Sequence, residues 1–251
     1  MTSCMVARVG AHSEITGLAE YSSVPVINAL SSDFHPLQTI ADLQTIYEAF
    51  PGTTPTPASL GLEGLKVAWV GDSNNVLFDL ATGCVKMGID IAVAAPEGYG
   101  IPDEMRSVIA GAGKDVPSPG RLAETTIPEE AVKDADIIVT DTWISMGQEA
   151  ETQKRLKAFA GYQVTNELAN RGGAKPGWKF MHCLPRHPDE VDDDVFYGHR
   201  SLVFPEGENR LWAAVCKLGY PFSLLLISLT LCSRVGSICC QQGKDPLIRP
   251  Q

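Results

Sequence analysis

Residues 181–188 read MHCLPRHP and place a cysteine beside a histidine and an arginine. A thiol in this setting can be a metal ligand, a redox group, a nucleophile or a buried structural group. A metal site would need further Cys or His at ligand spacing, and His182 is expected to point to the opposite face of the strand. No second cysteine lies nearby to form a disulfide. Locally, the pattern favours a buried structural role for Cys183.

Two arginines are candidates for binding an anion. Arg8 lies inside the apolar run 5–9 and is predicted to be buried, and a buried arginine usually has an anion or a carboxylate as its partner. Arg210 follows another expected strand, at residues 201–204, and the same argument applies to it.

Further polar side chains lie where helices begin or strands end. His35 precedes a helix and Gln38 lies in its first turn, so both can face one small ligand, although a capped helix explains the pair equally well. Asn74 and Asn75, at another helix start, can be caps or ligands. Asp141 directly follows an apolar strand, and its carboxylate can hold a substrate ammonium group.

The hydrophobic pattern predicts elements that bring these residues together. Two apolar runs flank a short helix within residues 4–32, as in the last βαβ part of something larger, and helical spacing covers 37–50. The turn-rich segment 53–64 is a predicted domain boundary. From residue 65 to 215, strands alternate with helices, apart from a looser region after residue 96.

This alternation predicts an α/β fold with a doubly wound parallel sheet covered on both faces. Such sheets bind ligands at the carboxyl ends of their strands. Four polar clusters follow expected strands, so we expect them to converge on one cleft; they lie at residues 71–75, 141–147, 182–186 and 205–210.

Composition excludes several classes of function. A net charge of −10 argues against a nucleic-acid-binding or anionic-membrane surface. The single glycine of the loop at Gly71 does not make a dinucleotide fingerprint. Seven cysteines without a CxxC pair favour a reducing compartment over a zinc ribbon or a disulfide scaffold. The apolar stretch 218–233 is shorter than the ~20 residues of a membrane span, and no targeting signal is visible.

Four motifs occur in the order SSDFHPLQ, GDSNNV, DTWISMG and HCLPR. Together they closely resemble the ornithine carbamoyltransferase family of the transcarbamylases, over residues 4–212. The resemblance implies a remnant of a carbamoyl phosphate domain at 1–36, an interdomain helix at 37–50 and an ornithine-binding domain at 51–215. It also implies transfer of the carbamoyl group of carbamoyl phosphate to the δ-amine of L-ornithine, which gives citrulline and phosphate without a metal or an organic cofactor.

The resemblance also implies roles for single residues. Arg8, His35, Gln38 and Arg210 resemble ligands of carbamoyl phosphate, with Arg8 and His35 placed to polarise the carbonyl oxygen as charge develops on it. Other residues resemble the groups that hold ornithine or border both substrates, namely Asn75, Asp141, Ser145, Met146, Cys183 and Leu184. In this family context Cys183 is expected to be a polar guide and proton partner for the attacking amine, not a covalent nucleophile.

Two departures from the family pattern affect these expectations. No Ser-Thr-Arg-Thr phosphate cradle precedes Arg8, so the chain is expected to begin near the end of the carbamoyl phosphate domain and to bind that substrate weakly. Residues 216–251, with four of the seven cysteines, are expected to be a poorly ordered tail outside the family pattern, arising from read-through or a mis-joined gene model.

The family resemblance further implies a homotrimer. It implies the mitochondrial matrix for a eukaryotic member with its full N-terminus, and the cytoplasm if the chain truly starts at Met1. Two functional hypotheses remain open. One is a working carbamoyltransferase, and the other is a catalytically inactive fragment that acts at most as an amino-acid-binding or interaction module.

Overall fold

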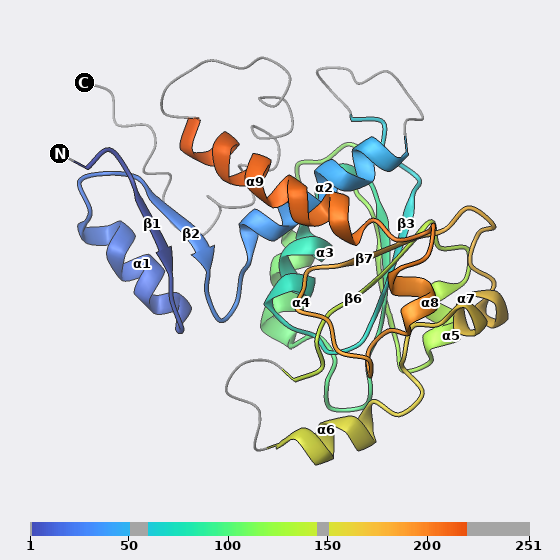
Figure 1. Cartoon of the computed structure of the whole chain (residues 1–251). Helices are drawn as coiled ribbons and strands as arrows, with labels where there is room; N and C mark the ends of the chain where they lie inside the picture. Colours follow the sequence, from blue (N-terminus) through green and yellow to red (C-terminus); the bar gives the residue numbers. More distant parts are fainter. Residues whose placement is uncertain (1, 51–59, 145–150, 220–251) are drawn as a thin grey trace.

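The computed structural model describes residues 2–50, 60–144 and 151–219, with side chains to Val215. Its centre is a five-stranded, fully parallel sheet in the order β5-β4-β3-β6-β7 (Figure 1). The strands are β3 (Lys66–Val70), β4 (Asp90–Ala94), β5 (Leu122–Thr125), β6 (Ile137–Thr140) and β7 (Lys179–His182). Along the chain, β4 and β5 follow on one side of β3, and β6 and β7 then follow on its other side. The strand order therefore reverses between β3 and β6.

Helices cover both faces of this sheet, as the sequence pattern predicts. Alternate strand residues point to opposite faces, and Val67 and Trp69 belong to one buried cluster while Ala68 and Val70 belong to the other. The first cluster includes residues of α2 (Pro36–Ala49), α3 (Asn75–Met87), α4 (Asp103–Ala112) and α9 (Val203–Gly219). The second includes residues of α5 (Pro128–Val132), α7 (Asn166–Gly172) and α8 (Asp193–Phe196).

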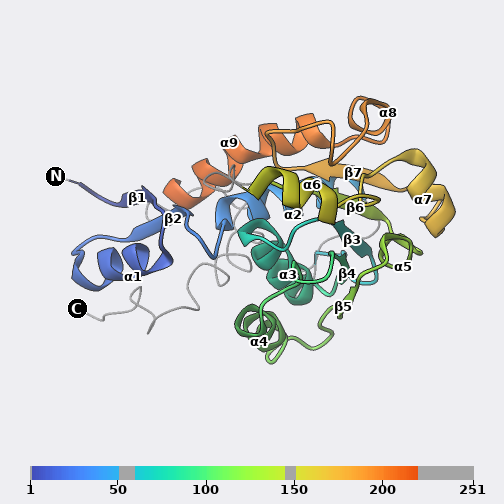
Figure 2. The ribbon, with the colours of Figure 1, turned by 90° about the horizontal axis from the view of Figure 1, so that it is seen from below.

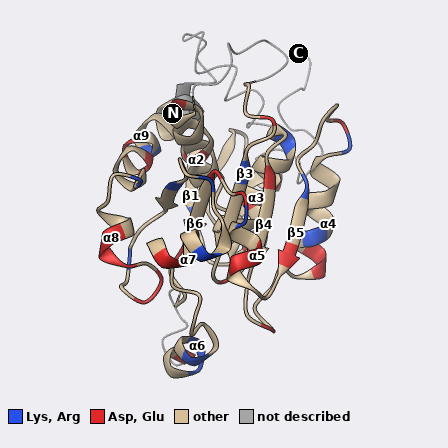
Figure 3. Ribbon diagram, turned by 90° about the vertical axis from the view of Figure 1, so that its right-hand side faces the viewer, with Lys and Arg blue, Asp and Glu red and all other residues tan. Residues whose placement is uncertain are grey.

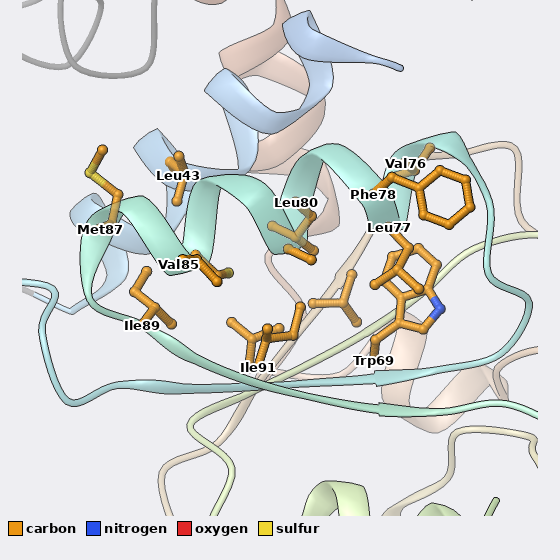
Figure 4. Close-up of a cluster of buried hydrophobic side chains, with 14 of the residues drawn as sticks. Leu43, Trp69, Val76, Leu77, Phe78, Leu80, Val85, Met87, Ile89 and Ile91 are labelled. Carbon is orange, nitrogen blue, oxygen red and sulfur yellow. The ribbon is translucent and has the colours of Figure 1, made fainter. Parts of the chain in front are cut away.

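Helix α3 shows how the sequence sets an element that carries the site. Asn74 caps its first turn by accepting from the backbone N–H groups of Val76 (3.1 Å) and Leu77 (3.2 Å). Gly88 ends the helix with a φ of 73°, a left-handed conformation that favours glycine. Between these ends, the helix packs apolar side chains onto Trp69 and its neighbours in the sheet (Figure 4). The site-bearing end of α3 is thereby fixed.

A smaller unit precedes this domain. Strands β1 (Met5–Arg8) and β2 (Val26–Leu30) form a parallel pair connected by α1 (His12–Tyr21), which confirms the predicted βαβ segment. Figures 1 and 2 show this unit at one end of the molecule, with α2 leading from it into the five-stranded domain. Helices α2 and α9 then pack along each other.

One predicted strand is wrong and one was missed. Residues 201–204 contribute only a single bridge, between Ser201 and Phe180, because α9 begins at Val203. Pro205 is compatible with helix there since it lies in the first turn, where its missing N–H costs no bond. The strand that the sequence did not predict is β5, in the looser region after residue 96. It lies at the edge of the sheet and has exposed residues, so it lacks the continuous apolar run that indicates a central strand.

Acidic residues lie on several elements, including the first turns of α5 and α8 (Figure 3). Among the residues that the structure describes, no helix has the length and hydropathy needed to cross a membrane. Most of the predicted boundary at 53–64 and most of the tail at 216–251 lie outside the described residues.

Candidate active site

Polar groups from three neighbouring elements meet at the carboxyl edge of the sheet, where the strand order reverses. Asp141 follows β6, is 6% exposed, and accepts a hydrogen bond from Asn74 Nδ2 at 2.7 Å. Its other oxygen accepts from the Cys183 thiol, after β7, with an Sγ–Oδ1 distance of 3.0 Å. The reversal of strand order is where open α/β sheets bind ligands, and Asp141 lies at its centre.

The two asparagines at the start of α3 have different contacts. Asn74 uses its oxygen as the helix cap, which leaves its amide nitrogen to orient Asp141. Asn75 instead donates to the Ser31 carbonyl at 2.7 Å and so joins the site to the segment after β2. The sequence left both residues open between cap and ligand; the structure shows Asn74 as the cap, and a ligand role for Asn75 stays a prediction.

The Cys183 side chain is a neutral thiol. Burial raises its pKa well above the usual value, and the charge of Asp141, the hydrogen bond to it, and the more distant Glu206 and Asp42 act in the same direction. A thiol, unlike a thiolate, is a poor nucleophile and donates a hydrogen bond. The geometry therefore places a weak proton donor beside a carboxylate.

His182 lies closer to this group than the strand alternation predicts. Strand β7 ends at His182, so Cys183 does not continue the alternation, and ligand atoms of Asp141, His182 and Cys183 lie within 4.8 Å of one another. His182 Nδ1 already accepts the backbone N–H of Leu184 at 3.0 Å, and Nε2 lies 3.4 Å from Glu190 Oε1.

Leu184 completes this corner of the site. Its backbone has a φ of 60°, unusual for a residue with a side chain, and the peptide bond to Pro185 is cis. The side chain is 43% exposed beside Cys183. An apolar surface is thereby available next to the thiol.

A buried ion pair supports the loop that follows β6. Arg155 of α6 (Thr152–Ala158) pairs with Asp72 and donates to the Trp143 carbonyl. Burial raises the pKa of Asp72 to about 6, and the charge of Arg155 opposes that increase. The pair holds the start of the loop between β6 and α6. Ser145 and Met146, which belong to this loop, lie outside the described residues.

The second group of predicted residues lies near the start of α2. His35 is 6% exposed, and its Nδ1 has no hydrogen-bond partner among the described residues. Burial lowers the pKa of His35 to about 3, and the positive charges of Arg210 and Arg8 add to the effect. A neutral imidazole between two cations can donate a hydrogen bond to a developing negative charge without being charged itself.

Two of the predictions for arginines need correction. Arg8 is exposed because β1 pairs with one strand only and alternates between half-buried and exposed residues. Its side chain makes no hydrogen bond or ion pair with the described residues. Arg210 lies on α9, not at a strand end, and donates to the Gln38 side-chain oxygen. Both arginines nevertheless lie close enough to His35 to affect its pKa.

Comparison with known proteins agrees with this geometry. Residues 63–217 match the family model "Aspartate/ornithine carbamoyltransferase, Asp/Orn binding domain", and residues 1–48 match its "carbamoyl-P binding domain". The chain belongs to this family. The contacts that link Asn74, Asp141 and Cys183 thus lie in the family's Asp/Orn-binding domain.

Individual relatives extend the comparison. The chain is similar to the mitochondrial ornithine carbamoyltransferase of Emericella nidulans, with 67% identity over 87% of this chain and 61% of that protein. It also resembles the crystal structure of the mitochondrial ornithine carbamoyltransferase of Coccidioides immitis, with a TM-score of 0.80, 62% identity, and coverage of 87% and 65%. For the ornithine carbamoyltransferase of Pyrococcus furiosus the TM-score is 0.77, with 41% identity and coverage of 87% and 66%. The chain therefore spans about 60% of the length of the Emericella relative.

The sequence did not reveal several residues that organise the site. Asp42 and Glu206 are fully buried between α2 and α9, and Asp79 is buried on α3. A signal was present, since Gln38 and Asp42 are four residues apart on one helix, as are Glu206 and Arg210. Without the contact between the two helices, however, each pair reads as an ordinary polar helix face.

Proposed function

We propose that this chain carries the site of an ornithine carbamoyltransferase, which transfers the carbamoyl group of carbamoyl phosphate to the δ-amine of L-ornithine. The observation that carries the proposal is the Asn74–Asp141–Cys183 arrangement at the reversal of strand order. Asp141 is an oriented carboxylate that can hold an ammonium group. Cys183 is a neutral thiol that can contact the attacking amine without forming a covalent intermediate.

The residues around His35 suit the other substrate. Arg8 and Arg210 supply positive charge for a phosphate dianion, and neutral His35 can donate to the carbonyl oxygen. Holding the amine at Asp141 and the carbonyl near His35 would make the reaction effectively intramolecular. By family resemblance, Asn75, Ser145, Met146 and Leu184 would complete the ornithine contacts. Gln38 would bind carbamoyl phosphate.

The same resemblance supports a homotrimer as the working assembly and the mitochondrial matrix as its compartment. The Emericella relative, for example, is a mitochondrial ornithine carbamoyltransferase. Sedimentation of the purified chain tests the assembly. A single species at the monomer mass would contradict the trimer.

One observation favours a second candidate function, an amino-acid-binding module without turnover. Arg8 is exposed and makes no hydrogen bond or ion pair with the described part of the chain, whereas Asp141 and Cys183 are held by several contacts. Among the described residues, more contacts therefore hold Asp141 and Cys183 than hold Arg8. Binding of L-ornithine without transfer would follow if that difference persisted in solution.

Calorimetry and a citrulline assay on the full chain separate these candidates. We expect L-ornithine to bind, and citrulline formation to saturate with both substrates at high carbamoyl phosphate. Asp141→Asn keeps the shape of the side chain and should abolish ornithine binding by removing its charge. Ornithine binding without citrulline would support the binding module. Absence of ornithine binding would contradict both.

A further inference from the structure

Two buried carboxyl groups between α2 and α9, Asp42 and Glu206, are not used by the chemistry described above, although both contact Gln38. Gln38, Asp42 and Glu206 are 1%, 2% and 1% exposed. Two carboxyl groups at this depth are costly unless they are paired, hydrogen-bonded or neutral. Their contacts show which of these conditions applies.

The amide of Gln38 joins the two carboxyl groups. Its Nε2 donates to Asp42 Oδ1 at 2.7 Å and to Glu206 Oε1 at 2.9 Å. A primary amide has two N–H groups, so both are used. The amide oxygen is left on the other side, where it accepts from Arg210. The hydrogen-bond network thus assigns the orientation of the Gln38 amide.

Glu206 also reaches the end of β7. Its Oε2 accepts the backbone N–H of His182 at 2.9 Å, while Oε1 accepts from Gln38. Both oxygens of Glu206 therefore accept from N–H donors. Asp42 Oδ1 accepts from Gln38, and a hydrogen bond between the two carboxyl groups lowers the pKa of Asp42 and raises that of Glu206, as expected for one proton held between them.

The surrounding charges are consistent with one shared proton. Burial raises the pKa of both carboxyl groups, and each is close to the other. Arg210 is the cation that faces them, Asp141 is an additional negative charge, and Asp79, Cys84 and Cys183 are nearby titratable groups. Two adjacent carboxyl groups rarely ionise together in a buried site, whereas one negative charge is balanced by Arg210.

We propose that Asp42 and Glu206 are a positioning pair that shares one proton and fixes the Gln38 amide with its oxygen toward the carbamoyl phosphate site. The pair connects the two halves of the site, since Glu206 also holds the backbone that precedes Cys183. Neither carboxyl group contacts the reacting atoms; each acts through Gln38 or His182.

The orientation of the Gln38 amide would let the site select carbamoyl phosphate over acetyl phosphate, an inference that rests on the proposed function. An amide oxygen accepts hydrogen bonds, so Gln38 can recognise the NH₂ group of carbamoyl phosphate. Acetyl phosphate has a methyl group at that position and cannot donate. A Gln38 amide free to turn would present its own NH₂ group and lose the distinction.

Two isosteric variants are expected to have opposite effects on the hydrogen bonds of the pair. In Asp42→Asn, the new NH₂ group can donate to Glu206 in place of the shared proton, so the network is retained. In Glu206→Gln, an NH₂ group must face either Gln38 or the His182 N–H, and two donors then meet. Asp42→Leu removes the contact altogether. The conservative change should therefore rescue Asp42 but not Glu206.

Infrared difference spectroscopy of the full chain at neutral pH tests the proton. We expect a protonated-carboxyl band that Asp42→Asn removes. Asp79→Asn is the matched control, because burial raises the pKa of Asp79 to about 8 and its band should be a different one. A spectrum unchanged by Asp42→Asn would overturn the shared proton.

Calorimetry with carbamoyl phosphate and acetyl phosphate tests the positioning role. The wild-type chain should prefer carbamoyl phosphate, and Asp42→Asn should retain the preference. Glu206→Gln and Asp42→Leu should reduce it about two- to tenfold, as expected for one neutral hydrogen bond. An equal preference in Glu206→Gln and the wild type would overturn this role. Failure of the wild type to bind either compound would instead contradict the proposed function, and the infrared result would still decide whether the proton is shared.

Discussion

The two parts of the site differ in how many elements hold them. Asp141 and Cys183 follow strands that are buried on both faces, and their side chains contact each other and the cap of α3. Arg8 ends a strand with one neighbour and is exposed. A side chain at the edge of a covered sheet is fixed by its surroundings, whereas one on a two-stranded unit depends on what else contacts it.

Trp69→Ala should have the largest effect on stability. The side chain is fully buried in the five-stranded domain, and its loss should lower the free energy of unfolding by about 3–5 kcal/mol through the cavity left behind. Urea unfolding measures the change. Ile15→Ala, in α1, is the control. It should increase hydrogen exchange of β1 and β2 while leaving the main transition in place, and equal effects of both variants on that transition would remove the distinction between the two regions.

Arg155→Met tests the buried ion pair under the site. Removing the cation leaves Asp72 buried without its partner, and we expect a loss of about 3 kcal/mol in the free energy of unfolding near neutral pH. Asp72→Asn in the same chain should recover much of it, which a double-mutant cycle measures. Additive losses would show that the two side chains do not depend on each other.

The buried carboxyl groups predict a stability that depends on pH. Asp79 has a pKa of about 8, against 3.8 without perturbation, because burial disfavours its charge. The folded chain then keeps a proton that the unfolded chain has lost, so the free energy of unfolding falls as pH rises between these values, by at most about 1.4 kcal/mol per pH unit for one group. Asp79→Asn should flatten this slope in urea unfolding, and an unchanged slope would contradict the assignment.

His35 acts in the opposite direction within an overlapping range. Its pKa of about 3 lies below the unperturbed 6.5, so the unfolded chain binds the additional proton and stability falls as pH decreases from 6.5 toward 3. Asp79→Asn leaves this decrease in place, which separates the two contributions.

Arg8→Ala should have the smallest effect on stability. An exposed side chain outside the core changes the free energy of unfolding by no more than about 0.5 kcal/mol. Its charge is nevertheless one cause of the lowered pKa of His35, so the substitution should raise that pKa in an NMR titration of the imidazole. Arg121→Ala, another exposed arginine, is the matched control and should leave His35 unchanged. No difference between the two variants would place Arg8 outside the site.

The pattern of strands and the positions of polar residues after them could be predicted because they depend on local order. Continuous apolar runs indicated strands covered on both faces, and Asp141, Asn74 and Cys183 each follow such a run. Carboxyl ends of parallel strands share one edge, so their convergence followed from topology. Strand β5 was missed because its exposed residues lack that signal.

The sequence by itself determined the doubly wound domain and the family motifs, since periodicity and residue order are properties of the chain. Only the tertiary structure decided which groups are charged and where they face. Gln38 and Glu206 are 168 residues apart and meet because α2 packs on α9. Arg8 was predicted to be buried and is exposed, because burial depends on how many strands lie beside it. The neutral state of Cys183 and of His35 and the raised pKa of Asp42 likewise follow from burial and neighbouring charges, which the order of residues does not contain.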